Sequence, residues 1–467
     1  MSPFLFAAPL GLLYLSAKSY LEEAPLNLIL WDFSGVFSIG LRMDTLSGIL
    51  ATTVLTIGLV VMRYSVRYLD DDPQKSRFLR YLSLTLCFVL LMLLSPNLLI
   101  FLFSWIGTSY FLHHLLVHFS DRLKALKAAS QKFWISRFGD LLVLSAGVTL
   151  YLAFGSLEFE TIFETLKDPS FVSANQFLIH LSSGLLVVGA MTKSAQFPFH
   201  FWLPNTMETP TPVSALMHAG VINAGGYLVI RTSPLLTEAP IVLSLLALTG
   251  GFTAFYGSLS MLTQSNVKKS LAYSTIAQMG FMMLQCGLGA FSVAVVHIIG
   301  HAFYKAYAFL SSGTVADIGR LNRYFPRSLP SPTIWTPLIA LFISFHILFV
   351  PLVLSGYEFS RTPGTTVLLI VLALAGAQIG MSPKNKVESA ITALVVISSY
   401  LLFANVMGLL LNDIVSEHTE HVDPLRLTAL FVTGSLFIGL YLIQNNLHRI
   451  SMTSFGRRLY VRALNGK

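Results

Sequence analysis

Five titratable side chains lie inside long apolar segments, where a charge is costly and its presence indicates function: Lys193, His218, His297, His301 and Lys305. Histidine gains and loses a proton near neutral pH, and lysine gives up its proton more readily when it is desolvated. His297, His301 and Lys305 follow at intervals of four residues, so on a helix they form a polar stripe that drifts by about 40° per step. These residue types in this pattern are typical of a path that passes protons through a membrane.

The stripe has two other interpretations. Its side chains could join helices through a structural hydrogen-bond network, and histidines four residues apart on a helix can share a metal ion. No acidic residue accompanies His297 and His301 in their segment, however, and Lys305 would repel a cation. The sequence also contains nothing similar to a phosphate loop, a nucleophile elbow or a nucleotide-binding fingerprint. We therefore predict no metal site, no cofactor and no catalytic residue in this chain.

Lys193 lies at the start of a segment that must be broken. Between the apolar run that carries Lys193 and the run that carries His218 stand Pro198, Pro204, Pro210 and Pro212. Each proline lacks an N–H group and clashes with the preceding helical turn. In lipid, such broken backbone is tolerated only where protein or a water-filled cavity covers it, and membrane transporters place ion sites at such breaks. We expect Lys193 and His218 to form an inner titratable pair, although a lone histidine can also be a core residue.

Arg137 and Asp140 stand at the start of another apolar segment, one helical turn apart. Asp140 needs a partner for its charge, which Arg137 or a neighbouring helix could supply. Structural pairing and electrostatic support of the titratable residues are both compatible with this spacing. Asp44, at the beginning of an earlier segment, is typical of an acidic residue at a helix N-terminus.

The composition places these residues in a membrane. Hydrophobic residues make up 54% of the 467 and charged residues only 11%, whereas soluble domains have about 25% charged residues. We predict an all-α polytopic membrane protein with 13–14 transmembrane helices, at least one of them broken. Residues 1–445 would form one integral domain, and 446–467 a basic amphipathic tail on the cytoplasmic side. The fourteen apolar windows are 3–18, 44–62, 79–94, 98–118, 133–154, 177–203, 212–231, 239–262, 270–288, 292–315, 333–355, 364–381, 389–412 and 425–445.

The loops give an orientation. Loops rich in Lys and Arg fall on one side of the predicted membrane, and acidic loops on the other; the basic ones are 63–80, 119–132, 263–269, 316–332, 382–388 and the tail. Because basic loops stay in the cytoplasm, both termini are expected there. The net charge of +8 is explained by this asymmetry, so nucleic acid is not an expected partner. Residues 26–40 alternate around Ser34-Gly35 and predict a hairpin on the outer side. Cys87 and Cys286 have no metal-ligand spacing.

Several motifs resemble the proton-conducting antiporter-like family, which includes the large membrane subunits of respiratory complex I and the Mrp cation/proton antiporter subunits. They are Lys193-Ser-Ala-Gln-Phe-Pro, Trp202-Leu-Pro, Pro210-Thr-Pro-Val-Ser-Ala-Leu and Lys269-Ser-Leu-Ala-Tyr-Ser-Thr, together with the stripe described above. The resemblance runs from about residue 42 to 315 and implies an antiporter-like helix bundle with its core in this range. It also implies that Lys193 is the lysine of the first broken helix, His218 a bridging histidine, and His297, His301 and Lys305 the central relay.

Two stretches resemble a narrower group, the DabB-type membrane subunits of bacterial inorganic carbon transporters: His218-Ala-Gly-Val-Ile-Asn-Ala-Gly-Gly-Tyr-Leu and Tyr304-Lys-Ala-Tyr-Ala-Phe-Leu-Ser-Ser-Gly. This resemblance implies a subunit in the bacterial inner membrane that lets protons, or sodium, run down their gradient. The energy would drive uptake of CO2 or bicarbonate by a DabA-like partner with a carbonic-anhydrase-like zinc site, where any hydration chemistry would take place. The alternative is a subunit of an Mrp-type antiporter or a complex I-like pump.

The chain departs from the complex I pattern at two places. Complex I subunits carry a glutamate after a tryptophan that pairs with the broken-helix lysine, but this chain has Trp105-Ile106-Gly107. The later windows 333–355, 364–381 and 389–412 contain no lysine, so the second broken-helix lysine of the family has no counterpart in them. Both departures favour the carbon-transporter subunit over the pump.

Overall fold

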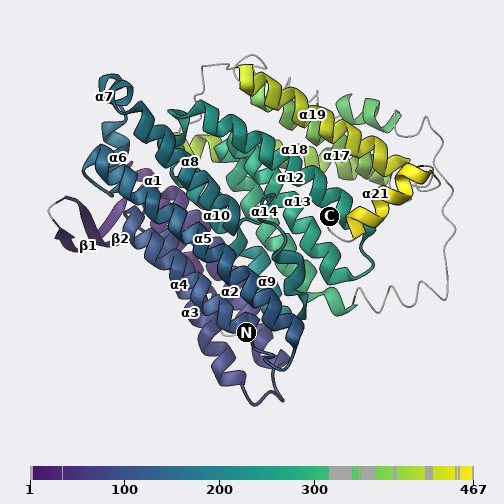
Figure 1. Cartoon of the computed structure of the whole chain (residues 1–467), viewed down its shortest axis with the longest axis horizontal. Coiled ribbons are helices and arrows are strands. Elements are labelled where there is room, and N and C mark those ends of the chain that lie inside the picture. Colours follow the sequence, from purple (N-terminus) through teal and green to yellow (C-terminus); the bar gives the residue numbers. More distant parts are fainter. Residues whose placement is uncertain are drawn as a thin grey trace.

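Helices of membrane length make up most of the structure, a computed structural model that describes residues 4–33, 35–314, 339–346, 348, 363–381, 386–415, 424–446, 450 and 453–464. Figure 1 shows these helices packed side by side, with many axes inclined in a common direction. A helix overlaps every predicted window, although 333–355 is described only at 339–346 and 348. Loop 316–332 and the charged residues Glu358 and Arg361 lie outside the described residues.

Within the described ranges, nine helical segments are long and apolar enough to cross a membrane. They are Thr45–Tyr68 (α2), Lys75–Leu93 (α3), Leu98–Leu116 (α4), Leu123–Phe154 (α5), Thr211–Arg231, Pro240–Thr263 (α12), Phe291–Leu310 (α14), Val387–Leu411 in α18 (Lys386–Leu411) and Pro424–Asn445 (α19). The other long helices are Phe4–Leu21 (α1), Gln176–Lys193 (α8), Val267–Gly287 (α13) and Pro363–Gly380 (α17). The prediction of an all-α multi-pass membrane protein is confirmed, apart from one hairpin.

That hairpin pairs β1 (Leu26–Phe33) with β2 (Phe37–Met43) in antiparallel register, as the alternation at 26–40 predicts. It projects from one end of the bundle (Figure 1), and most of β1 is exposed. The amide of Asn97 donates to the carbonyl of Ser38 over 2.7 Å, while the Asn97 carbonyl oxygen accepts the N–H of Ile100 at the start of α4. The hairpin is therefore anchored to the cap of α4.

The predicted break follows Lys193, the last residue of α8. The chain then turns through a 3-10 helix, η1 (Leu203–Glu208), before α9 (Thr211–Ala219), η2 (Val221–Asn223) and α10 (Ala224–Arg231). Pro204, Pro210 and Pro212 lie in or directly before the first turns of η1 and α9, where a missing N–H has no helical partner to lose. The Ser194 hydroxyl donates to the carbonyl of Ile222 over 2.7 Å and joins the end of α8 to η2.

Helices α12 and α13 approach each other backbone to backbone. Gly250 and Gly280 face one another, and a Cβ atom on Gly280 would meet the backbone of Ala254, while one on Gly250 would meet the backbone of Leu284. Backbone cannot move aside as a flexible side chain can, so the close packing requires glycine at both positions. This packing fixes α13, whose N-terminal half contacts the titratable side chains described below.

Remaining segments join the bundle at its edges. Two short helices, α6 (Phe159–Thr165) and α7 (Pro169–Ala174), precede α8, and α11 (Ser233–Thr237) precedes α12. Within the predicted basic tail, α21 (Ser454–Leu464) lies against α12 and exposes Arg457 and Arg458.

Replacing Gly280 by alanine should destabilise the protein by about 1–3 kcal/mol, because the added methyl group must push α12 and α13 apart. The measurement is the thermal unfolding midpoint of the detergent-solubilised protein. The matched control is Gly184→Ala on α8, where a Cβ meets nothing within 4 Å. That control should leave the midpoint unchanged or raise it slightly; equal midpoints for both variants would contradict the close-packing argument.

Candidate functional site

Lys193 is buried at the end of α8, and its contacts come from α4. Its ammonium group donates to the carbonyl oxygen of Trp105 over 3.0 Å and to the hydroxyl of Ser109 over 2.6 Å. The same nitrogen lies 4.2 Å from the centre of the Trp105 ring, in a cation–π contact. The direct partners of this lysine are thus two uncharged oxygens and an indole face.

Arg137 and Asp140 form an ion pair on α5, with 2.6 Å between Nη2 and Oδ2. Asp140 is buried and interacts electrostatically with Lys193. Helices α5 and α8 come close enough for this interaction because Gly139 lies against Thr192 and leaves no room for a side chain. The two residues are thus placed beside Lys193, in the position that an electrostatic role requires.

Lys132 is a buried lysine beside Lys193 that the sequence interpretation assigned to a cytoplasmic loop. Helix α5 begins at Leu123, ten residues before the predicted apolar window, and so includes Lys132. The Lys132 ammonium donates to the carbonyl oxygen of Ser109 over 2.8 Å. A signal was present in the sequence, since Lys132, Ser136 and Asp140 follow at intervals of four and all three are buried.

The predicted stripe lies on α14. Lys305 is fully buried, and its ammonium donates to the carbonyl oxygen of Leu271 over 3.1 Å and to the hydroxyl of Ser274 over 2.8 Å, both on α13. The His297 and His301 rings stack with 6.1 Å between their centroids. Neither nitrogen of His301 has a hydrogen-bond partner among the described residues. The stripe faces the protein interior and leaves imidazole nitrogens free to bind water or a proton.

His218 joins this second group of side chains. Its Nδ1 lies 3.0 Å from the hydroxyl of Thr275 on α13, and its ring stacks on Phe309 of α14 at 4.3 Å. Thr275 in turn donates to the carbonyl of Leu271, which also accepts from Lys305. No hydrogen bond between described residues joins His218 to Lys193, whose partners lie on α4.

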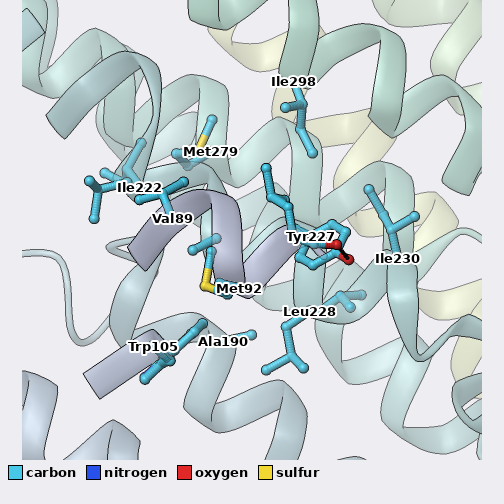
Figure 2. Close-up of a cluster of buried hydrophobic side chains, with 14 of the residues drawn as sticks. Val89, Met92, Trp105, Ala190, Ile222, Tyr227, Leu228, Ile230, Met279 and Ile298 are labelled. Carbon is cyan, nitrogen blue, oxygen red and sulfur yellow. Dashed lines mark hydrogen bonds between the residues drawn. The ribbon is translucent and has the colours of Figure 1, made fainter. Parts of the chain in front are cut away.

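Apolar side chains connect the two polar groups. Figure 2 shows buried residues of α3, α4, α8, α10, α13 and α14 gathered in one cluster. The cluster includes Trp105, whose ring makes the cation–π contact with Lys193. It also includes Ile298, which follows His297 in the chain. The described structure therefore holds two polar centres, one on α4, α5 and α8 and the other on α9, α13 and α14, with a packed apolar core between them.

A buried ion pair at one end of the bundle was also missed by the sequence interpretation. Arg231, the last residue of α10, binds Asp44 through two hydrogen bonds of 2.5 and 3.0 Å. Asp44 caps α2 as expected, because its side chain accepts the N–H of Ser47. The Tyr227 hydroxyl accepts from Arg231 and donates to the Leu93 carbonyl, so the pair ties α10 to α2 and α3. It borders a cavity of about 510 Å³.

Metal-ligating side chains do not gather in the described part of the chain. No group of three or more His, Cys, Asp or Glu residues there could hold an ion. Both cysteines are free, Cys286 in the core and Cys87 on the surface.

Removing the charge of Asp44 should be strongly destabilising, because it leaves Arg231 buried and unpaired. For Asp44→Asn we expect a loss of about 3–5 kcal/mol, although asparagine still caps the helix. The thermal unfolding midpoint of the solubilised protein measures this loss. Adding Arg231→Met to the same chain should restore most of the midpoint, whereas Glu164→Gln, in the exposed pair with Lys167, should not change it. A double variant less stable than Asp44→Asn alone would contradict the pairing.

Two family models match the chain. Residues 95–348 match the model described as "NADH:quinone oxidoreductase/Mrp antiporter, TM", and residues 33–79 match "NADH-Ubiquinone oxidoreductase (complex I), chain 5 N-terminus". The first match alone covers more than half of the chain and contains both polar centres.

Among curated proteins, the chain is 42% identical to the "Probable inorganic carbon transporter subunit DabB2" of Halothiobacillus neapolitanus, over 80% of this chain and 68% of that protein. It is 37% identical to the "Probable inorganic carbon transporter subunit DabB" of Hydrogenovibrio crunogenus, over 63% and 56%. It is also 39% identical to "NADH-ubiquinone oxidoreductase chain 5" of Metridium senile, over 59% and 45%. The chain thus spans about two thirds or less of these relatives' lengths.

Solved structures share the fold. A chain of the Mrp complex from Dietzia sp. DQ12-45-1b aligns over 100% of this chain and 51% of its own length, with a TM-score of 0.59 and 24% identity. A chain of the archaeal membrane-bound sulfane sulfur reductase aligns over 99% of this chain and 92% of its own, with a TM-score of 0.57 and 17% identity. At these identities the likeness concerns the helix bundle only.

Proposed function

The chain belongs to the NADH:quinone oxidoreductase/Mrp antiporter family of multi-pass membrane proteins, and we propose that it is the membrane subunit of an energy-coupled inorganic carbon transporter. The observation that carries this proposal is the 42% identity to DabB2 across 80% of the chain. In this role it lies in the bacterial inner membrane with both termini in the cytoplasm. It lets protons, or sodium, move down their gradient and passes the energy to its partner.

The two polar centres suit proton movement. Lys193 and Lys305 each bind one carbonyl and one hydroxyl oxygen, and these partners carry no charge that would hold the lysine permanently protonated. His218, His301 and His297 extend the second centre with imidazoles that titrate near neutral pH. In the proposed mechanism each lysine gains and loses a proton within its own centre, the imidazoles relay protons in the second centre, and Arg137 and Asp140 adjust the field at Lys193.

The chemistry of carbon uptake resides in the partner. We propose a DabA-like subunit that carries a carbonic-anhydrase-like zinc site and either hydrates CO2 or accumulates bicarbonate. The present chain supplies no cofactor and no catalytic residue to that reaction. Its contribution is the coupled ion movement.

The second candidate is a subunit of an Mrp-type antiporter or of a complex I-like pump. The shared family and the fold of the Dietzia Mrp complex favour it. Ile106 in place of the usual glutamate opposes it, as does the absence of lysine from α17 and from Val387–Leu411 in the described part of α18.

Growth in air of a bacterium that lacks carbonic anhydrase tests the proposal. Co-expression of this chain with its zinc-protein partner should restore growth, and Lys193→Ala or Lys305→Ala should abolish the rescue because each removes a proton-carrying group. Lys127→Ala is the matched control, since Lys127 is exposed on α5, and it should rescue fully. Immunoblots of the membrane fraction verify equal expression.

The other outcomes are decisive as well. Full rescue by both lysine variants would contradict proton conduction through these residues and indicate that the chain only anchors its partner in the membrane. No rescue by the unaltered pair, with both proteins present in the membrane, would favour the antiporter or pump subunit.

A further inference from the structure

Two lysines from different helices meet at one residue of α4. The Lys132 ammonium on α5 donates to the carbonyl of Ser109 over 2.8 Å, and the Lys193 ammonium on α8 donates to the hydroxyl of the same serine over 2.6 Å. Both lysines are buried. The charge on Lys193 acts electrostatically on Lys132.

Positive charge exceeds negative charge around this serine. Helix α5 contributes Arg137 and Asp140 besides Lys132, and Asp140 is already paired with Arg137 at 2.6 Å. Helix α4 contributes His113 and His114, which carry no negative charge. On η1, Glu208 forms an ion pair with Arg122, with 3.5 Å between Oε2 and Nη1. Asp140 interacts with both lysines as well, but one carboxylate cannot balance Arg137 and two ammonium groups, so full charge on both lysines is strongly disfavoured.

Lys132 also reaches a cavity that Lys193 does not line. The cavity holds about 120 Å³, and Ser109, His113, Lys132, Ser136 and Arg137 are among its lining residues. A volume of roughly 10–15 Å³ on this measure admits one water molecule, so several fit here. His113 Nδ1, buried at the cavity, has no hydrogen-bond partner among the described residues.

We propose that Lys132 is a further proton-carrying residue of this chain and that Lys132 and Lys193 share a single proton. Lys132 takes a proton from a hydronium ion in the cavity, forming an N–H bond as an O–H bond breaks and leaving water. The charge on Lys132 repels the charge on Lys193, whose N–H bond breaks as a water molecule takes the proton and becomes hydronium. The proton count balances and no electrons move. This inference rests on the proposed ion-conducting function, but not on inorganic carbon as the substrate.

The test is the pH titration of the lysine ammonium signals in the purified full-length protein, labelled with 15N at lysine Nζ. Lys132→Met identifies the Lys132 signal by its loss. With Lys193→Met, the pH at which half of the Lys132 ammonium is lost should rise by roughly one unit, a tenfold change in proton affinity, because a neighbouring positive charge is gone. Lys127→Met should not move it, and the Lys305 signal should stay in place in every variant.

Lys193→Gln gives the same comparison with a polar side chain if the methionine variant does not fold. An unchanged Lys132 midpoint in a folded Lys193 variant would overturn the proposal. The carbon assay separates this inference from the proposed function. A shifted Lys132 midpoint without carbon rescue would support the shared proton and contradict only inorganic carbon as the substrate. Carbon rescue with an unshifted midpoint would support the proposed function and contradict only the shared proton.

Discussion

An ammonium group in a membrane interior must find oxygen atoms, and this protein meets that demand twice in the same way. Lys193 and Lys305 each bind a backbone carbonyl and a serine hydroxyl about one turn apart on a neighbouring helix: Trp105 and Ser109 on α4, and Leu271 and Ser274 on α13. Carbonyl and hydroxyl oxygens solvate the charge without cancelling it. A carboxylate would instead stabilise one protonation state far more than the other.

Helix packing sets these distances, since the oxygens sit on regular helices and not on loops. The position of α13 depends on backbone contact with α12 at Gly250 and Gly280, and that of α4 on the cap at Asn97, which also anchors the hairpin. The proline-broken connection after Lys193 then allows α8 to end at the depth of Trp105. The bundle thus positions the lysines, and the loops mainly connect its helices.

The sequence predicted the features that depend on local pattern. Apolar length located the spans, the prolines located the break after Lys193, and the four-residue spacing placed the stripe on one face of α14. Lys132 was missed because basic residues before an apolar window are usually loop residues, and its four-residue spacing from Ser136 and Asp140 was the sequence signal that it lies on a helix. The roles of Ser109 and Ser274 as hydrogen-bond partners of the lysines were not predicted, because a serine inside a helix does not indicate which side chain packs against it. The Asp44–Arg231 pair joins helices far apart in the chain, which no local pattern can indicate.

The separation between Asp44 and Arg231 has a consequence for biosynthesis. The two residues stand 187 positions apart, so the carboxylate leaves the ribosome long before its partner exists. At about 5–20 residues per second, the delay lasts on the order of 10–40 seconds. During that interval the N-terminal end of α2 must remain in contact with water or with the insertion machinery. The arrival of α10 is therefore the event that first gives this buried carboxylate its partner.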